Sequence, residues 1–332
     1  MQQNCFFQES ANSKNCIESM VLPLLVFVIG ILLIVYFSEK LVEATVGTSL
    51  GFGISTFLIS VIFIGFDPEN LGLGAVASYD GVAGIPIGTI IGSAMVAIAL
   101  AFGITALISP MQFRKVPMQI PLIQVGAVLL FGVLSIDGML SRLDGVILLV
   151  GFGAAIWYLI HLGKRGLDIR PTGETAEFLE EGRELNRWQA AAQLAGSLVA
   201  IVVGSEFVVW GFEKLVTGYE ISDTVFAITV LALLVSIEEV ARELPAALKG
   251  RPEITVGNVI GSVLAFFLFN AGVIALVRPV PITSEVISFY LPLSLGLVLF
   301  VTYLMIRKSI PRWAGIILVL GYVIFFSRGY LF

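Results

Sequence analysis

Apolar stretches of about 20 residues recur from Met20 to Phe332, and each is long enough to cross a hydrocarbon core of about 30 Å. Hydrophobic residues make up 58% of the chain and charged residues 13%, with a mean hydropathy of +0.99. A soluble domain of this composition would lack the polar side chains that cover a water-exposed surface. The sequence therefore predicts an all-α membrane protein with many spans.

The apolar stretches define ten predicted spans. They cover residues 20–47, 53–80, 85–109, 117–134, 145–163, 188–218, 223–248, 254–277, 284–306 and 313–331. The most polar connection falls near the middle of the chain, at residues 164–187. We therefore expect four parts: a tail at 1–19, a five-helix unit at 20–163, a loop at 164–187 and a second five-helix unit at 188–332.

Lys and Arg side chains are concentrated in the loops on one side of the predicted bundle, which marks the cytoplasmic side. With the N-terminus outside, the inner loops hold Arg114, Lys115, Lys164, Arg165, Arg170, Arg183, Arg187, Lys249, Arg251, Arg307, Lys308 and Arg312. The outer segments hold Lys14, Arg142, Arg278 and Arg328. We therefore expect an integral protein of the cell membrane with both termini outside.

The two cysteines of the chain, Cys5 and Cys16, lie in the predicted outer tail. In an oxidising compartment a disulfide that closes a short loop is one interpretation. Two free thiols in the tail are the other, and the sequence does not separate them.

An internal repeat relates the two halves of the chain. "SEKLVEATVGTSLGFGIS" (38–55) resembles "SEFVVWGFEKLVTGYEIS" (205–222), and "IPIGTIIGS" (85–93) resembles "ITVGNVIGS" (254–262). Five spans separate the copies, and an odd number inverts the second copy relative to the first. Inverted repeats of this kind are typical of secondary transporters, which bind their substrate near the midplane where the repeats meet.

Polar residues interrupt one span of each half between these landmarks. The first half has "DPEN" (Asp67–Asn70) and the second has "SIEE" (Ser236–Glu239). Pro68 lacks an N–H group and disrupts a helix, and the freed backbone groups must face protein, ions or water. Carboxylate and carbonyl oxygens are the ligands that Ca²⁺ requires. We interpret these segments as parts of a cation site.

These residues resemble the two alpha-repeats of the cation/calcium antiporter superfamily, which includes the sodium/calcium exchangers, over nearly all of 20–332. "VSIEE" (235–239) falls on the family's Thr-Ser-Leu-Pro-Glu, and "GNVIGS" (257–262) matches its Gly-Asn-x-Ile-Gly-Ser. The resemblance implies a ten-helix exchanger with alternating access. It implies Glu239 as the ion-binding glutamate and Ser236 and Ser262 as oxygen ligands, with Ser93 in the matching place of the first repeat.

The sequence also departs from the family pattern. Glu238 replaces the proline before the glutamate. Two alignments of the first repeat are possible. Alignment back from "GTIIGS" puts Asn70 on the family's glutamate, whereas alignment forward from "GIS" puts Gly72 there. We prefer the first alignment, because it keeps the polar residues of the first repeat in register with those of the second. Four residues after each motif serine the exchangers carry Asn or Asp, but this chain has Ala97 and Phe266.

Several of these residues have a structural interpretation as well. Glu238 is either a ligand or an i,i+4 partner of Arg242. Asp67 and Glu69 are either ligands or helix caps, since Asp followed by Pro is a favoured helix start. Asn70 is either a neutral ligand or a side chain that hydrogen-bonds the backbone groups freed by the helix break. The next carboxylate, Glu243, is expected near the inner end of its span.

The predicted metal ligands are Glu239, Ser236, Glu238, Asp67, Glu69, Asn70, Ser93 and Ser262. We expect a secondary active antiporter that exchanges Ca²⁺, or a similar divalent cation, for Na⁺ or H⁺. The alternatives are a divalent exchanger coupled to H⁺ with no role for Na⁺, and a divalent cation channel or uniporter. The sequence predicts neither an enzyme, nor a bound cofactor, nor a nucleic-acid partner; inorganic cations and the lipid bilayer are the expected partners.

Overall fold

The fold was obtained as a computed structural model, which describes residues 13–51, 67–82, 84–112, 119–163, 187–219, 222–236, 238–248 and 252–331. Helical segments occupy part of each of the ten predicted spans. The prediction of an all-α protein is therefore confirmed. Cys5 lies outside the described residues, and so do eight of the twelve Lys and Arg residues in the predicted inner loops.

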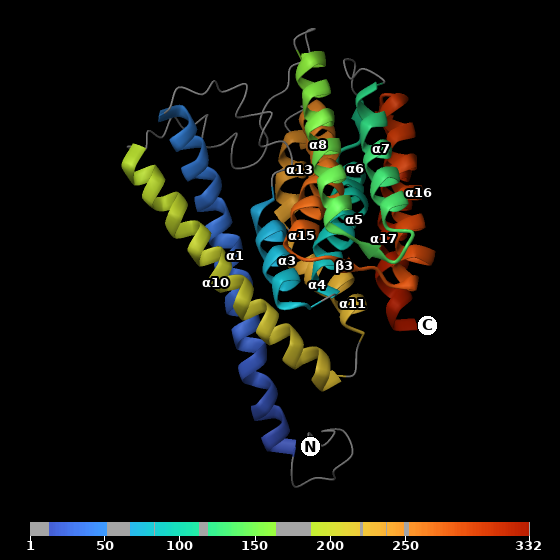
Figure 1. The fold of residues 1–332 in the computed structure, drawn as a ribbon. Coiled ribbons are helices and arrows are strands. Elements are labelled where there is room, and N and C mark those ends of the chain that lie inside the picture. Colours follow the sequence, from blue (N-terminus) through green and yellow to red (C-terminus); the bar gives the residue numbers. More distant parts are fainter. Residues whose placement is uncertain are drawn as a thin grey trace.

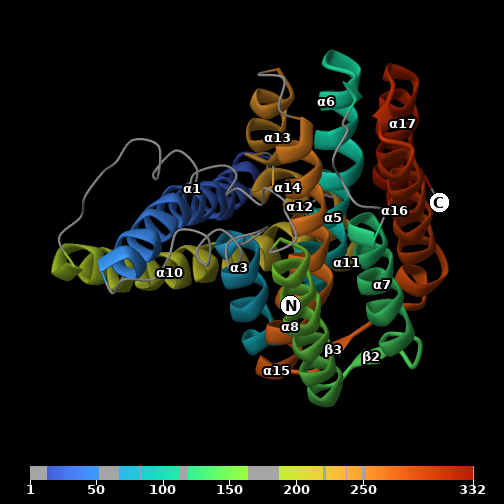
Figure 2. The same ribbon diagram turned by 90° about the horizontal axis from the view of Figure 1, so that it is seen from above.

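Two long helices stand to one side of the bundle. Helix α1 (Ser13–Gly51) and helix α10 (Arg187–Tyr219) lie against each other along much of their length and are tilted relative to the other helices (Figures 1 and 2). A Cβ atom on Gly30 would lie 2.7 Å from the carbonyl oxygen of Gly204, so their backbones touch at this crossing. Small residues permit such an approach between helices in lipid.

The first half adds four further spans. One of them is built from several consecutive segments, in which those labelled η are π-helical. The segments are α3 (Pro68–Asp80), α4 (Gly84–Ile87), η1 (Gly88–Gly92), α5 (Ser93–Met95), η2 (Val96–Ala101), α6 (Phe102–Ile108), α7 (Gln119–Leu134) and α8 (Arg142–Gly163). The α4–α6 run is one continuous membrane-length stretch, Gly84–Ile108.

The second half follows the same plan. Its segments after α10 are α11 (Asp223–Phe226), η3 (Ala227–Leu231), α12 (Ala232–Val235), α13 (Glu238–Leu248), α14 (Pro252–Leu264), η4 (Ala265–Asn270), α15 (Ala271–Val277), η5 (Val286–Tyr290), α16 (Leu291–Ile306) and α17 (Arg312–Leu331). The π-helical segments η2 and η4 occupy matching positions, 169 residues apart, in the two halves.

Two short antiparallel strand pairs join the halves. Strand β1 (Met111–Gln112) pairs with β4 (Ser309–Ile310), and β2 (Met139–Leu140) pairs with β3 (Val280–Pro281). Strands β1 and β3 follow matching helices, α6 and α15, while β2 and β4 precede α8 and α17. Each pair is therefore the counterpart of the other, as an inverted repeat requires.

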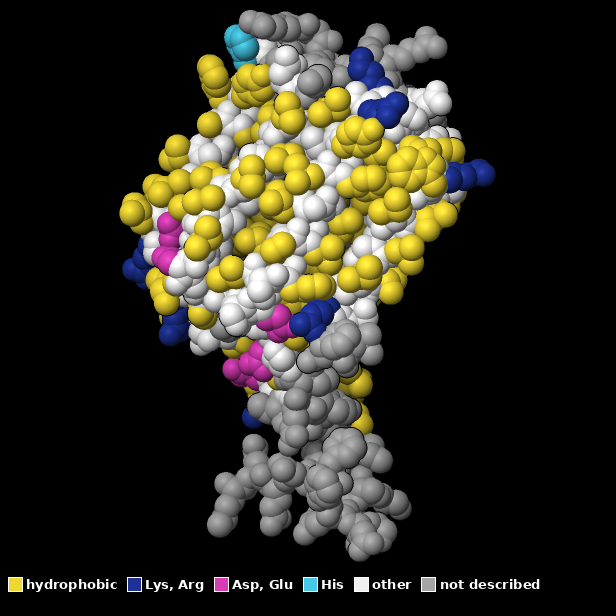
Figure 3. All heavy atoms as spheres, turned by 90° about the vertical axis from the view of Figure 1, so that its right-hand side faces the viewer, with side chains coloured by type: hydrophobic (Ala, Val, Ile, Leu, Met, Phe, Trp, Pro, Cys, Tyr) yellow, Lys and Arg dark blue, Asp and Glu magenta, His cyan; other side chains and the backbone are white. Residues whose placement is uncertain are grey.

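The exterior is suited to lipid. Six helical stretches of the described chain are long and apolar enough to cross a membrane: Val21–Leu41, Gly84–Ile108, Arg142–His161, Trp188–Val216, Thr255–Val277 and Val286–Ile306. On the face shown in Figure 3, hydrophobic side chains cover the middle of the bundle and Lys and Arg lie toward its two ends. Helix α1 begins, and α17 ends, toward the same end of the molecule (Figure 1).

A glycine stripe brings the two halves together at the centre. Cβ atoms on Gly84, Gly88 and Gly92 would each lie 2.4–2.6 Å from backbone carbonyl oxygens of α11 and η3. The Gly-rich segment of the first half therefore has the close-packing role that small residues have in membrane bundles. Gly257, which occupies the place of Gly88 in the second half, has no such neighbour within 4 Å among the described atoms.

Candidate functional site

The first polar segment begins a helix inside the bundle. Asp67 caps α3, since its Oδ1 accepts a hydrogen bond from the backbone N–H of Asn70 (3.0 Å), and Pro68 follows at the first helical position. This is the helix start that the sequence predicts at Asp-Pro. Asp67 is 2% exposed, and Glu69 and Asn70 are fully buried.

Asn70 connects the two halves through its side chain. Its amide nitrogen donates to Asp67 Oδ2 (2.9 Å) and to Ser236 Oγ (3.0 Å). Its Oδ1 accepts from Ser93 Oγ (2.5 Å). All four side chains are buried, so four of the predicted ligands form one polar cluster.

The second polar segment also interrupts a helix. Helix α12 ends at Val235, Ser236 has φ −108° and ψ 14°, and α13 begins at Glu238. The sequence predicts one continuous span over 223–248, because no proline marks this point. The structure breaks it at Ser236, whose hydroxyl bonds Asn70 of the other half instead of a neighbour in its own helix.

Glu239 lies one residue into α13 and is fully buried. The amide nitrogen of Asn258 donates to its Oε2 (3.1 Å), and Ser262 Oγ donates to its Oε1 (3.4 Å). Asn258 is missing from the predicted ligands. It precedes Ser262 by one helical turn in an apolar helix, and this spacing was the signal that could have identified it.

The two clusters are counterparts. Ser93 donates to Asn70 and Ser262 donates to Glu239, and both pairs are 23 residues apart in the chain. The match supports the alignment that places Asn70, and not Gly72, at the position of the glutamate. The first half thus presents an amide oxygen where the second half presents a carboxylate.

The remaining predicted ligands are less defined. Glu69 is buried in the first turn of α3, and it takes no part in the hydrogen bonds given above for either cluster. The side chains of Glu238 and Arg242 lie outside the described part of the chain, so their pairing stays a prediction.

The side-chain oxygens of the two polar clusters are of mixed chemical type. Among the described residues no group of three His, Cys, Asp or Glu side chains has the geometry of a metal site. The buried set is instead carboxylate, amide and hydroxyl oxygens, which suit hard cations such as Ca²⁺ and Na⁺ better than Zn²⁺. An ion there would replace hydrogen bonds that these groups now make with one another.

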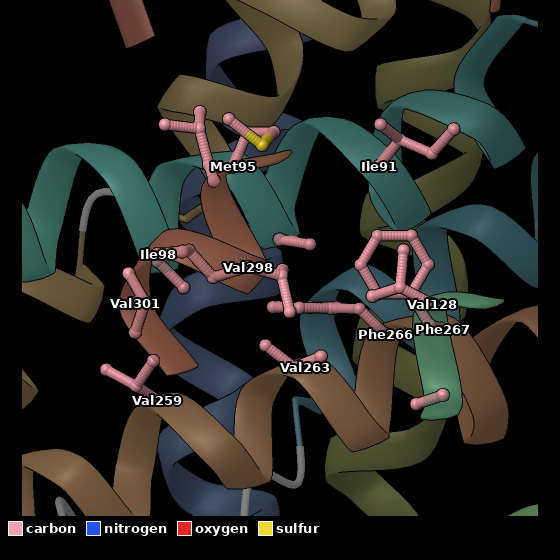
Figure 4. Close-up of a cluster of buried hydrophobic side chains, with 14 of the residues drawn as sticks. Ile91, Met95, Ile98, Val128, Val259, Val263, Phe266, Phe267, Val298 and Val301 are labelled. Carbon is pink, nitrogen blue, oxygen red and sulfur yellow. The ribbon is translucent and has the colours of Figure 1, made fainter. Parts of the chain in front are cut away.

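The two positions after the motif serines are apolar, as the sequence indicates. Ala97 is fully buried, and so is Phe266. Figure 4 shows Phe266 within a cluster of hydrophobic side chains that includes Val263, Phe267 and Val298. Neither side chain supplies an oxygen ligand.

Comparison with known proteins identifies the family. The sequence matches the family described as sodium/calcium exchanger protein over residues 22–161 and again over 189–328. The chain belongs to this family. The two matched regions correspond to the two halves of the fold, and the family consists of membrane transporters rather than enzymes.

Relatives match along nearly their full length. The uncharacterized membrane protein MJ0091 of Methanocaldococcus jannaschii is 32% identical over 303 residues, which cover 90% of this chain and 95% of that protein. The inner membrane protein YrbG of Escherichia coli is 28% identical, with 94% and 98% covered. The solved sodium-calcium exchanger NCX_Mj, soaked with Na⁺ and Sr²⁺, superposes with a TM-score of 0.60 at 27% identity, with 94% and 99% covered. These likenesses place the chain among cation exchangers of the membrane.

Proposed function

We propose that this exchanger moves Ca²⁺, or a similar divalent cation, against a gradient of Na⁺ or H⁺ by alternating access. The observation that carries the proposal is the paired arrangement of Ser93 with Asn70 and Ser262 with Glu239. Each pair lies beside a helix start buried within the membrane bundle. In the proposed membrane orientation both termini lie outside the cell.

Ca²⁺ takes six to eight oxygen ligands. We assign the Glu239 carboxylate as the principal ligand, with oxygens of Asp67, Asn70 and the three serines completing part of the shell. Glu69 and Glu238 stay in the proposed set as further carboxylates of the same two segments. The ligands come from both halves, so a bound ion would connect elements that alternating access must separate.

The movements of the divalent ion and the co-ion are coupled through the charge of the site. A carboxylate at membrane depth is costly when nothing neutralises it, by at least ~2.5–3.5 kcal/mol on insertion scales. A divalent ion or the co-ions neutralise the site, and the α1 and α10 pair, which packs on the outside of the bundle, then slides past it. Because divalent and co-ion compete for overlapping oxygens, their movements are opposite.

The family favours Na⁺ as the co-ion, and the solved relative was studied with Na⁺ and Sr²⁺. H⁺ is the second candidate, because Ala97 and Phe266 remove two polar positions of the sodium exchangers. A channel would move the divalent ion without any counter-ion.

Flux in vesicles separates these alternatives. Full-length protein in proteoliposomes would be given ⁴⁵Ca²⁺ under an outward Na⁺ gradient, an outward H⁺ gradient or neither. We expect uptake that requires one of the two gradients, its loss in Glu239→Gln and its retention in Glu285→Gln, which makes the same change at a partly exposed glutamate. Uptake without a counter-ion would indicate a channel, and full uptake by Glu239→Gln would refute the site.

A further inference from the structure

Glu243 is a buried carboxylate that the proposed site does not use. It follows Glu239 by four residues on α13, so the two Cα atoms lie on the same helix face one turn apart. Its exposure is 0%, and its carboxylate makes no hydrogen bond of good geometry with the described residues, although the Asn258 side chain lies near it.

The surroundings of Glu243 point it toward the ion site. Its carboxylate is close enough to Glu239 for their charges to repel, and the Asn258 side chain lies near both. Thr255 Oγ1 donates to the backbone carbonyl of Glu243 (3.0 Å), which fixes α13 against α14. Otherwise α13 packs on η2 and α6, the part of the first half that covers 96–108 and carries no charged residue.

The position of the first half that corresponds to Glu243 has no room for a side chain. Gly74 occupies the position of Glu243, and Thr89 occupies that of Asn258. A Cβ on Gly74 would lie 2.6 Å from Thr89 Oγ1 and 2.4 Å from Ile274 Cδ1. Only the second of these two positions, therefore, has space for a side chain, and that space holds a carboxylate.

A buried carboxylate whose charge is not neutralised and that makes no well-formed hydrogen bond is strongly unfavourable. A cation beside Glu243 would remove that penalty. Asn258 is included in the group because its side chain lies near both glutamates and an amide oxygen suits a monovalent cation. The position lies between Glu239 and the turn that joins α13 to α14. Any ion there would adjoin the Glu239 position and interact with it.

We propose that Glu243 and Asn258 form a second cation subsite next to Glu239, which takes a monovalent cation such as Na⁺. The inference rests on the proposed function, because it adds a position for the co-ion beside the divalent ion. A single carboxylate is neutralised by one monovalent charge, whereas the Glu239 group takes the divalent ion. Na⁺ at Glu243 then repels Ca²⁺ at Glu239 and promotes its release.

Equilibrium binding tests this subsite with purified full-length protein. ⁴⁵Ca²⁺ is displaced by Na⁺ at constant pH and ionic strength in the unchanged chain, in Glu243→Gln, in Glu243→Asp and in the control Glu285→Gln. For Glu243→Gln we expect Ca²⁺ to bind without Na⁺, but half-displacement to need at least about tenfold more Na⁺, with a less steep curve. Glu243→Asp, which keeps the charge, should retain most of the displacement.

Other results would overturn the subsite. A Glu243→Gln displacement curve equal to that of the unchanged chain means that no Na⁺ binds there. A change confined to the pH dependence of Ca²⁺ binding means that the carboxyl holds a proton instead. Two further measurements keep the two proposals apart. Retained ⁴⁵Ca²⁺ binding by Glu239→Gln would refute the divalent site. Direct ²²Na⁺ binding that is not reduced in Glu243→Gln would refute the subsite.

Discussion

Asn70 contacts three other predicted ligands at once, Asp67, Ser93 and Ser236. It donates to one carboxylate and one hydroxyl and accepts from another hydroxyl, so both ends of the amide are used. A carboxylate at this position would lose the donors, and a hydrocarbon would lose every contact. The amide therefore stabilises the first half of the site when no ion is bound.

Asn70→Asp should make the ion-free protein less stable and more dependent on Ca²⁺. Two carboxylates would then face each other where Asn70 and Asp67 now form a 2.9 Å hydrogen bond. Loss of a hydrogen bond to a charged group costs about 1.5–3 kcal/mol. Thermal unfolding with and without Ca²⁺ measures the difference. The double exchange Asp67→Asn with Asn70→Asp restores one donor and one acceptor and should recover part of the stability. An unchanged Ca²⁺-dependent shift in Tm would argue against this role for Asn70.

Asp67→Asn separates helix capping from ion binding. Asn is as good a cap as Asp, so the start of α3 should be kept, while the loss of the Oδ2 acceptor for Asn70 should lower the stability of the ion-free protein. If the carboxylate also binds the ion, Ca²⁺ affinity should fall by about tenfold or more, equivalent to 1.4 kcal/mol. Calcium binding to the purified variant measures this, and an affinity within twofold of the unchanged chain would leave Asp67 as a cap alone.

At the scale of elements, the two halves use the same segments with different packing. Gly88 in η1 lies against the backbone of η3, whereas its counterpart Gly257 in α14 has no described atom within 4 Å of the position that a Cβ atom would take. The same asymmetry distinguishes Gly74 from Glu243. The repeat fixes which helix lies where, and these local differences decide which positions can hold a side chain.

Gly88→Ala should destabilise the protein and Gly257→Ala should not. The added Cβ at Gly88 would lie 2.5 Å from the carbonyl oxygen of Ala227, and overpacking costs about 1–3 kcal/mol. At Gly257 nothing described lies within 4 Å, and alanine favours a helix by about 1 kcal/mol. Thermal stability measured by size-exclusion chromatography after heating compares the two, and equal stability of the variants would contradict the packing.

The sequence was sufficient to predict the spans, the repeat and the helix start at Asp67, because hydropathy and proline chemistry are local signals. The break at Ser236 could not be predicted in this way, since it accompanies a hydrogen bond to Asn70, 166 residues away. Nor could the depth of Glu243 be predicted. Its place near the end of an apolar stretch indicated the inner surface, but tertiary packing buries it completely.

At the scale of the whole molecule, the proposed orientation has a direct test. Cys5 and Cys16 are the two cysteines of the chain, so a membrane-impermeant maleimide reports on the tail alone. In intact cells we expect labelling from outside after mild reduction, with a Cys5→Ser/Cys16→Ser variant as control. Labelling that requires permeabilised membranes would place the N-terminus inside. Labelling without reduction would indicate free thiols instead of a disulfide.

The inverted halves meet at Asn70 and Ser236, and the site is common to both. A cation bound there must contact oxygens from each half, and crystals of the full chain soaked in Sr²⁺ would show its position by anomalous scattering. We predict a peak in contact with the Glu239 carboxylate and with an oxygen of the Asp67–Asn70 segment, absent in Glu239→Gln. Strontium bound only to surface acids, or a peak unchanged in that variant, would contradict the account.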